Sequence, residues 1–591
     1  MSFAFYYTTA LILLMTIFLI KEWLDVEIVV FSVLLLLLFS KVITIEEAFS
    51  GFSNEGMISV GFLYIVAGAL ANTGAMNQLC SMVLGNKRSS ITWKLVRLTF
   101  PVAAASAFIN NTPLVAIAIP TVRSWTEKNR YPISKFFIPL SFATILGGVC
   151  TLIGTSTNLV VHGLLIKNGL PGLHFFELTK VGLPVALVGI LFICLVGHYL
   201  LPERKEPLVE LGEKTREFVI ELKVADAYIH VGKTIEEAGL RHLTGLFLFQ
   251  IERDGKIIAP ARPDDRIFVN DRLFFTGLPK TILELQRTPG LQLIKDSPFN
   301  LKQYDSDRIK TYEAVISASS PLMGKNVRDS NFRTNYGAVI IAIHRNGERI
   351  QKKIGDVVLH AGDTLLLLAD ENFFKQWYHS VDFYLISTAD QISSKSRLQS
   401  YLSIALLLGV IFLTVFNILP LIVSAGLAAM IAIITRCISV VELKHQVDWR
   451  VLIIIASAFG ISTGITNSGL ANVLADVIML CGDYLGIMGI VAGIYFLTNI
   501  YTCFISNNAA AAMLFPVALS TAHHLNVPVL PFAIAIAIAA SACFATPIGY
   551  QTNMMVYGPG GYKFMDFVKI GIPLQILVGV IAVLLIYYWY F

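Results

Sequence analysis

Two long stretches of the chain, residues 1–201 and 400–591, are near-continuous runs of apolar segments. Each segment is long enough to cross about 30 Å of hydrocarbon, which a helix does with about 20 residues. A backbone in lipid must satisfy its own polar groups, and a helix does so internally. Because 55% of the residues are hydrophobic and only 14% are charged, we predict a polytopic α-helical membrane protein and no enzymatic activity.

Charge and cysteine usage exclude two other classes of function. The formal net charge is only +5 and the sequence has no dense Lys/Arg run, so we expect no nucleic-acid partner. The seven cysteines occur singly within the apolar stretches, without a CxxC pair. We interpret all of them as small core residues and not as metal ligands or a disulfide framework.

Residues 202–397 differ from both flanking stretches. This part is charged, has no cysteine, and carries short apolar runs such as AVIIAI and TLLLLAD that are bounded by Asp-Gly and Asn-Gly turn signals. Alternating short runs between such turns indicate strands. We predict a soluble α+β insert between two membrane parts.

The insert repeats itself with an offset of 92 residues. Gly232 matches Gly324, and Asp271 matches Asp363 just before a strand-like run in each copy. Self-similarity of this kind predicts tandem domains, here at 208–293 and 300–392. We interpret both aspartates as turn or strand-entry residues in preference to ligands.

The two copies resemble the TrkA-C (RCK-C) domain, a small α+β regulatory module of channels and transporters. The similarity lies in the hairpin turn and in the strand entries Asn270-Asp271-Arg272-Leu273 and Gly362-Asp363-Thr364-Leu365. It implies regulation by an unknown small cytosolic ligand bound within 208–392. No G-x-G-x-x-G is present, so a nucleotide-binding partner domain is not expected.

The first membrane part contains one apolar segment that does not behave as a simple span. Residues 95–122 are interrupted at Asn110-Asn111-Thr112-Pro113, and both flanks are basic. Lys and Arg concentrate on the cytoplasmic side, and about 14 residues per arm are too few to cross. We predict a re-entrant hairpin among spans near 4–20, 25–40, 57–79, 138–166 and 179–201.

The second membrane part follows the same plan with the opposite charge pattern. The segment 487–522 is interrupted at Ser506-Asn507-Asn508, and neither flank has Lys or Arg, so this hairpin should enter from outside. Five crossings per half force an inverted orientation, which places the insert 202–397 in the cytoplasm and both termini outside. The spans are expected near 400–416, 419–435, 451–470, 530–557 and 568–590.

The pattern T-x-I-G-x-x-T-N occurs once in each half, as TLIGTSTN from Thr151 and TPIGYQTN from Thr546. The interrupted hairpins correspond at the same offset of 395 to 396 residues. Polar, glycine-containing breaks at matching places in two hydrophobic halves indicate a transporter built from inverted repeats, with its site at the breaks. The predicted repeats are 1–201 and 398–591.

The breaks are polar but uncharged, which limits what they can bind. Residues 98–122, 138–160, 487–522 and 530–557 contain no Lys, Arg, Asp or Glu. An anion would therefore depend on helix N-termini, amides, hydroxyls and co-bound cations. A proton relay ordinarily uses a buried carboxylate or histidine, so we favour Na+ coupling. The alternative for a single triplet is hydrogen bonding between helices with no ligand.

The runs FINNTPLVAIAIP and FISNNAAAAMLFP, with the two octapeptides, resemble the divalent-anion:sodium symporters of the ion transporter superfamily. The similarity covers both membrane halves, and it implies an elevator-type homodimer in the lipid bilayer, with two or more Na+ sites and the anion held between the hairpin tips. The substrate residues that it implies are Asn110, Asn111, Thr112, Ser506, Asn507 and Asn508, and the Na+ residues are Asn111, Gly154, Thr155, Asn158, Asn507, Thr546, Thr552 and Asn553.

Three departures from that family bear on the substrate. Asn110 stands where the family has serine, Asn508 stands where it has threonine, and the loops lack the double proline of dicarboxylate carriers. The TrkA-C-like insert and the string TPIGYQTNMMVYGPGGY resemble the sulfate-transporting branch. We therefore expect a sulfate carrier in the cell membrane. The alternatives are a proton-coupled carrier of dicarboxylates or arsenite-like substrates and a membrane sensor that does not transport.

Overall fold

The chain forms two compact units in the computed structural model. The first comprises Met1–Glu203, Ile392–Val556 and Phe564–Phe591, and the second comprises Arg204–Gln391 with Tyr557–Lys563. The structure describes residues 3–21, 23–73, 90–129, 131–204, 219–240, 246–254, 256–258, 261–262, 264–277, 288–293, 309–317, 320–345, 348–350, 354–370, 372–377, 380, 382–387, 397–439, 442–443 and 447–591.

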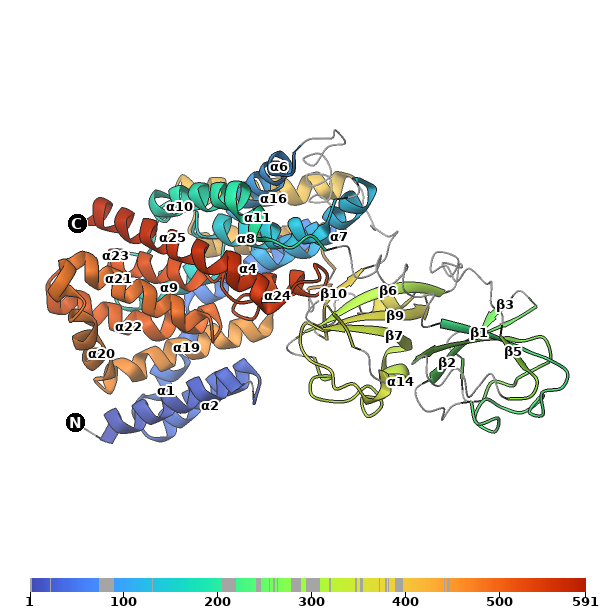
Figure 1. The fold of residues 1–591 in the computed structure, drawn as a ribbon. Coiled ribbons are helices and arrows are strands. Elements are labelled where there is room, and N and C mark those ends of the chain that lie inside the picture. The colour runs from blue at the N-terminus through green and yellow to red at the C-terminus, as the bar shows by residue number, and fades with distance from the viewer. Residues whose placement is uncertain are drawn as a thin grey trace. The chain divides into compact units, whose positions relative to one another are not determined.

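The first unit is helical (Figure 1). Its first half contains α1 (Phe3–Lys21), α2 (Val26–Phe39), α3 (Ile45–Phe49), α4 (Glu55–Asn72), α6 (Ile91–Ser106), α7 (Asn111–Asn129), α8 (Phe137–Gly148), α9 (Ser156–Lys167), α10 (Thr179–Phe192) and α11 (His198–Leu200). Its second half contains α16 (Arg397–Val415), α17 (Leu421–Ile434), α19 (Trp449–Asn467), α20 (Leu470–Met479), α21 (Gly482–Thr502), α22 (Asn507–Leu525), α23 (Leu530–Ser541), α24 (Gln551–Tyr557) and α25 (Phe564–Tyr590).

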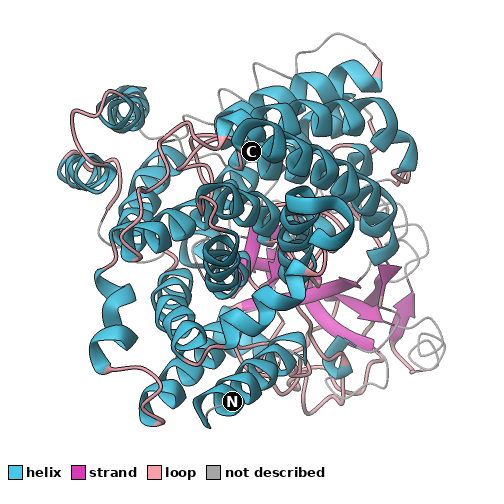
Figure 2. Ribbon diagram, turned by 90° about the vertical axis from the view of Figure 1, so that its left-hand side faces the viewer, coloured by secondary structure: helices cyan, strands magenta, loops and turns pink. Residues whose placement is uncertain are grey.

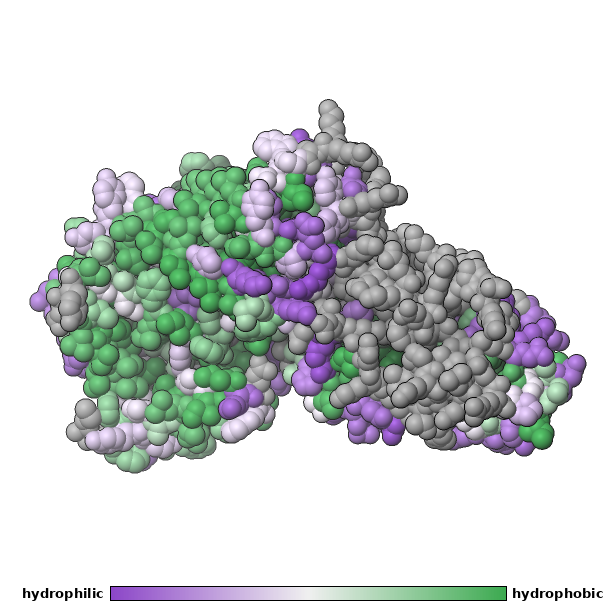
Figure 3. Space-filling model, viewed as in Figure 1, coloured by the Kyte–Doolittle hydropathy of each residue, from purple (hydrophilic) through white to green (hydrophobic). Residues whose placement is uncertain are grey.

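Length and composition suit this unit to a membrane. Seven helices among the described residues are long and apolar enough to cross one. Large apolar side chains are exposed on the outside of the unit, such as Phe39 at 78% and Leu398 at 78%, and the surface seen in Figure 3 is largely hydrophobic there. In water such a surface would be costly, whereas in lipid it is the expected exterior.

The predicted spans and the helices differ in three respects. The segments 138–166 and 530–557 are each divided into two helices, and α3 and α20 were not predicted. The arms of the first hairpin are 16 and 19 residues long, so the predicted length of about 14 is wrong. The helix α7 continues past its apolar residues into Thr126–Asn129, because helix propagation does not require apolar side chains. The end of the predicted span 57–79 lies outside the described residues.

One prediction about the cysteines is also wrong. Cys481 is exposed, at the turn between α20 and α21, whereas Cys150, Cys194, Cys437 and Cys543 are buried and Cys503 is intermediate. Cys80 lies outside the described residues.

The second unit holds the strands that the structure describes, arranged in two five-stranded antiparallel sheets (Figure 2). The order of the first sheet is β3-β2-β4-β1-β5, and that of the second is β10-β6-β9-β7-β8. Replacing each strand of the first sheet by its counterpart 92 residues later gives the order of the second sheet, read from its other edge. The strands are β1 (Val219–Val224), β2 (Leu246–Arg253), β3 (Lys256–Ile258), β4 (Arg272–Gly277), β5 (Leu291–Leu293), β6 (Ile309–Ile316), β7 (Ala338–Arg345), β8 (Glu348–Arg349), β9 (Thr364–Asp370) and β10 (Phe383–Ser387), with short helices α14 (Phe332–Tyr336) and α15 (Asn372–Trp377).

Asp271 and Asp363 hold corresponding turns in the two sheets. Asp363 accepts two hydrogen bonds from the Arg345 guanidinium, both at 2.7 Å, and one from the backbone N–H of His360 at 2.9 Å. Asp271 makes the equivalent bonds with Arg253 and with the backbone N–H of Phe268. The hydrogen bond with Asp363 is the largest cause that raises the pKa of Arg345. Each fully buried carboxylate thus has a structural role before its strand.

Candidate functional site

Four breaks in the helices meet inside the first unit, each taken here with the first residues of the helix that follows it. Tip 1 (residues 107–113) joins α6 to α7, and loop 1 (149–158) joins α8 to α9. Tip 2 (503–508) joins α21 to α22, and loop 2 (542–553) joins α23 to α24. Backbone N–H groups in the first turn of the helix that follows have no partner within that helix. These segments contain the interruptions that the sequence predicts.

A buried asparagine folds each loop in the same way. The Nδ2 group of Asn158 donates to the carbonyl oxygens of Gly148 at 3.2 Å and Thr151 at 2.8 Å. The Nδ2 group of Asn553 donates to the carbonyl oxygens of Cys543 and Thr546, both at 3.1 Å. All three positions are related by 395 residues, so both loops close around an equivalent carboxamide.

A hydroxyl holds each tip in the same way. The Ser106 hydroxyl reaches Asn111 Oδ1 at 2.6 Å and the carbonyl oxygen of Thr144 at 2.8 Å. The Thr502 hydroxyl reaches Asn507 Oδ1 and the carbonyl oxygen of Ala540, both at 2.8 Å. The offset is 396 residues at every position. Each tip is therefore fastened to its own hairpin arm and to the broken helix beside it.

Further hydrogen bonds cross between the two halves of the unit. Asn111 Nδ2 donates to the Tyr550 hydroxyl at 2.5 Å, which joins tip 1 to loop 2. Asn508 Oδ1 accepts from the Ser156 hydroxyl at 3.1 Å, which joins tip 2 to loop 1. The Ser141 hydroxyl on α8 reaches Asn553 Oδ1 at 2.7 Å. Residues about 400 positions apart thus form one polar cluster in an apolar surrounding.

The residues of loop 1 fit a small hard cation. Asn158 is fully buried, and its Oδ1 atom has no hydrogen-bond partner among the described residues. The surrounding donors are carbonyl, amide and hydroxyl oxygens, which suit hard cations. No group of three His, Cys, Asp or Glu side chains that could hold a metal ion occurs in the described part of the chain.

Two glycines permit the tight course of the loops. A Cβ atom on Gly154 would lie 2.4 Å from the carbonyl oxygen of Gly148, and one on Gly549 would lie 2.3 Å from Cys543 Sγ. Real Cβ atoms do not approach other heavy atoms so closely. The glycine of each octapeptide is therefore required by a close approach, of Gly154 to the end of α8 and of Gly549 to Cys543 within loop 2.

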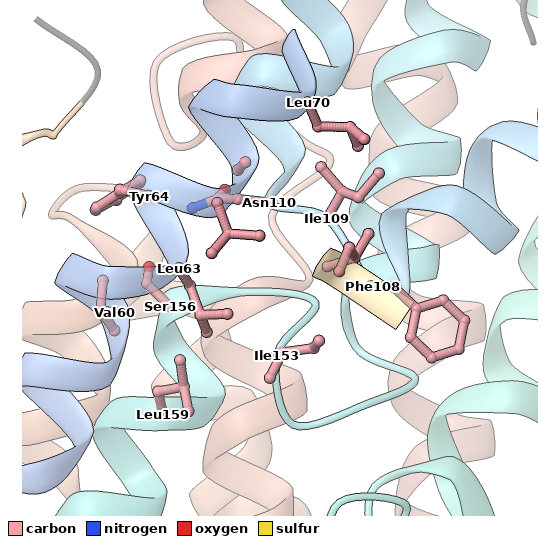
Figure 4. A pocket seen from close by; sticks show the side chains of 13 residues that line it. Val60, Leu63, Tyr64, Leu70, Phe108, Ile109, Asn110, Ile153, Ser156 and Leu159 are labelled. Atoms are coloured by element: carbon pink, nitrogen blue, oxygen red, sulfur yellow. The ribbon is translucent and has the colours of Figure 1, made fainter. Parts of the chain in front are cut away.

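A small cavity borders tip 1 and loop 1 (Figure 4). The helix α4 contributes Tyr64 among apolar side chains, tip 1 contributes Asn110, and Ser156 lies at the start of α9. Asn110 therefore faces the cavity, whereas its neighbour Asn111 faces loop 2. The remaining lining is apolar: Val60, Leu63, Val66, Ala67, Leu70, Phe108, Ile109, Ile153, Leu159 and Leu407.

The predicted site residues differ in how deeply they are buried. Asn111, Asn158, Thr552 and Asn553 are almost fully buried, whereas Thr112 lies at the exposed margin, where its hydroxyl donates to Gln551 Oε1 at 3.0 Å. Thr155 and Asn508 are also buried. Gly154 lies in loop 1, and Thr546 lies in loop 2. Asn507 Oδ1 accepts from the Thr502 hydroxyl. The Ser506 Oγ atom is buried with no hydrogen-bond partner among the described residues.

Several members of the cluster were not predicted. Ser106 and Thr502 lie five residues before Asn111 and Asn507, so a comparison of the two halves at offset 396 could have identified them. Ser141 corresponds to an alanine in the other half, and only the tertiary structure brings it to loop 2. Tyr550 lies inside the octapeptide, at a position where the two copies differ.

Known proteins are similar to this chain over nearly its whole length. The sequence profile of the citrate transporter family matches residues 16–526 and 500–591. A Chlamydomonas reinhardtii protein named "Putative sulfur deprivation response regulator" is 37% identical over 95% of this chain and 98% of its own length. An uncharacterized transporter of Synechocystis is 29% identical over 98% and 96%, respectively. Sodium/sulfate cotransporter 1 of Chlamydomonas reinhardtii is 26% identical over 96% and 88%.

Proposed function

Because the chain belongs to the citrate transporter family, we propose that it is a Na+-coupled symporter of a divalent anion and that this anion is sulfate. Family membership makes the chain a multi-pass membrane protein and a secondary transporter of anions. It also confirms the predicted ion transporter superfamily. The coupling ion and the anion are the proposed part.

The observation that carries the proposal is the hydrogen-bond pattern that recurs at offsets of 395 and 396 residues. The Asn158 and Asn553 clamps, and the bonds of Ser106 and Thr502, are equivalent in the two halves. This recurrence supports two half-sites related by an inverted repeat. Inverted repeats with broken helices are the usual frame for a substrate site near the middle of the membrane.

Na+ is the proposed co-transported ion at each half-site. In the first, Asn158 Oδ1, the backbone of loop 1 with Gly154 and Thr155, and Asn111 would hold it; in the second, Asn507, Thr546, Thr552 and Asn553 would do so. These residues offer neutral oxygens, which hold a cation without competing positive charge. Two Na+ ions would balance the two negative charges of the anion.

The anion is proposed to lie between tip 1 and tip 2, near Asn110, Asn111, Thr112, Ser506, Asn507 and Asn508. No Lys or Arg occurs in the broken segments. The free N–H groups and positive ends of α7 and α22, with the co-bound Na+, therefore supply the attraction. An anion that binds only when Na+ is present is the basis of coupling.

The proposal extends to the transport motion and the topology. The helices that carry the tips and loops move together, by an elevator-type motion, against the remaining helices of the first unit. The protein is a homodimer with both termini outside. The insert is a cytoplasmic pair of TrkA-C-like domains that responds to a small cytosolic ligand. A chain with residues 208–392 replaced by a short linker should transport without responding to such ligands.

The test is uptake of radiolabelled sulfate into proteoliposomes that contain the purified full-length protein. An inward Na+ gradient should drive accumulation, and replacing Na+ by K+ or by a proton gradient should not. Sulfate uptake that is equal without Na+ would refute the coupling. Thermal-shift measurements with sulfate, succinate, citrate and phosphate, each with and without Na+, then identify the anion that binds the native state.

A membrane sensor is the second candidate function, because a relative that matches 95% of this chain is named as a regulator of the response to sulfur deprivation. A sensor would be stabilised by sulfate and Na+ in the thermal-shift measurement but would move no sulfate across the proteoliposome membrane. A transporter shows both effects.

A further inference from the structure

The equivalent positions 155 and 550 break the symmetry of the two half-sites. The first octapeptide has a threonine there and the second has a tyrosine, although the neighbouring clamps match throughout. One large hydroxyl-bearing side chain is therefore present in loop 2 where loop 1 has a small one.

The Tyr550 hydroxyl lies where three of the four segments meet. It belongs to loop 2, accepts a hydrogen bond from Asn111 Nδ2 of tip 1 at 2.5 Å, and is 3.4 Å from Thr155 Oγ1 of loop 1. The Tyr550 side chain is only 7% exposed. A phenol so deeply enclosed by the proposed substrate and Na+ residues is in contact with both half-sites.

The hydrogen bonds around this hydroxyl leave its proton available. Its oxygen accepts from Asn111 Nδ2, and its O–H proton can still be donated to another acceptor. The distance of 3.4 Å to Thr155 is longer than the usual O–H···O separation of about 2.7 Å. A negatively charged oxygen near the tips would be a better acceptor, because hydrogen bonds to ions are stronger.

Two carboxamide oxygens of the cluster already accept hydrogen bonds. Asn111 Oδ1 accepts from Ser106, and Asn508 Oδ1 accepts from Ser156. The free oxygen of Asn158 is the one proposed for Na+. A proton on a bound anion would therefore compete with Ser106 and Ser156 for these two carboxamide oxygens, whereas an anion without a proton needs no acceptor. The hydroxyl oxygens of Thr155 and Ser506 are weaker acceptors than the anion itself.

We propose that Tyr550 determines substrate specificity by donating its phenolic O–H to the anion, which selects a dianion without a proton. Sulfate is such an anion at neutral pH, whereas phosphate keeps a proton. This inference rests on the proposed function and specifies the anion class at the same site. Sites built around particular hydrogen bonds discriminate strongly against analogues that leave a buried group unpaired.

The test compares the wild type with Y550F and Y495F in full-length protein reconstituted into proteoliposomes. Y550F removes only the hydroxyl. Tyr495 on α21 is fully buried, and its hydroxyl has no hydrogen-bond partner among the described residues, so Y495F is a matched control. Initial rates of Na+-driven sulfate uptake give KM and kcat, and unlabelled phosphate at pH 7 is the competitor.

Y550F should raise the KM for sulfate roughly tenfold or more, as expected for one lost hydrogen bond to a charged group. The inhibition constant of phosphate should change less, so the preference for sulfate over phosphate falls. Y495F should leave KM, kcat and this preference unchanged. A structural role for Tyr550 would instead lower kcat and the melting temperature with no change in preference.

Three outcomes overturn the assignment: an unchanged KM and preference in Y550F, a loss of kcat and stability alone, or a wild type that phosphate inhibits as strongly as sulfate does. A wild type without any Na+-dependent anion uptake or binding would overturn the proposed function itself. The two failures are thus distinguishable in one set of measurements.

Discussion

Asn158 and Asn553 make equivalent hydrogen bonds with Nδ2 but differ at their second polar atom. Asn553 Oδ1 accepts from Ser141, whereas Asn158 Oδ1 has no partner among the described residues. Both side chains are fully buried. Because an unpaired buried acceptor is costly, a ligand at loop 1 would stabilise the protein more than the contacts alone suggest.

At this scale we predict that N158A abolishes the stabilisation of the protein by Na+ and lowers its melting temperature. The substitution leaves two backbone carbonyls unpaired, at a cost of about 2 to 4 kcal/mol. The measurement is thermal unfolding of purified protein over a series of Na+ concentrations. N168A is the control, since the Asn168 side chain donates to the carbonyl oxygen of Leu164 at the end of α9. A Na+ response in N158A equal to that of the wild type would contradict the prediction.

We also predict that G154A and G549A eliminate transport, because the added Cβ would overlap Gly148 at the end of α8 in the first case and Cys543 in the second. Gly409 in α16 has no atom within 4 Å of an added Cβ, so G409A should be neutral or stabilising by about 1 kcal/mol, the helix preference of alanine over glycine. Uptake rate and melting temperature distinguish the three variants. Normal uptake by G154A would show that loop 1 can relax without losing its site.

At the scale of elements, the two broken helices explain why polar loops are tolerated among apolar segments. Non-helical backbone at membrane depth is stable only where protein buries it or a cavity borders it. The carboxamides of Asn158 and Asn553 satisfy two carbonyls each, and the side chain of Gln575 accepts from the backbone N–H groups of Phe544 and Ala545 at 3.2 and 3.0 Å. Side chains thus satisfy backbone carbonyl and N–H groups at both breaks, which stabilises one conformation of each loop.

Each sheet of the second unit has at one turn an ion pair between a buried aspartate and a partly exposed arginine. We predict that D363N increases hydrogen exchange at the amides of β7 and β9 in the full-length protein. The substitution weakens the hydrogen bonds between the buried position 363 and Arg345, at a cost of about 1 to 3 kcal/mol. D356N removes an exposed pair with Arg328 and should cost less than about 1 kcal/mol. Equal exchange in the two variants would show that the Asp363 pair contributes little.

At the scale of the whole molecule, the proposed topology predicts which face each exposed cysteine reaches. Cys481, at the turn between α20 and α21, should react with a membrane-impermeant maleimide in intact cells, because the second hairpin is expected to enter from outside. C481S is the control for labelling elsewhere. A cysteine at the exposed insert position 264, introduced as D264C in C481S, should react only after permeabilisation. The reverse pattern would invert the topology.

The sequence by itself determined the class of protein and the places of the polar breaks. Apolar segments of this length form helices in lipid, because a helix satisfies the backbone polar groups within one segment. The glycines and asparagines of the octapeptides are local signals: each glycine lies in the break, and each asparagine lies in the first turn of the helix that follows. The expected arm length of the first hairpin was wrong, because apolar length does not fix where a helix ends.

Only the tertiary structure decided which breaks touch. The meeting of Asn111 with Tyr550 joins residues separated by 439 positions, and it depends on how α6 packs on α8 and α22 on α9 and α23. Local propensity and hydrophobic periodicity carry no information about such pairs. The equivalence of the two halves could be read from their offset, but the exception at Tyr550 acquired a role only when its hydroxyl was found between tip 1 and loop 1.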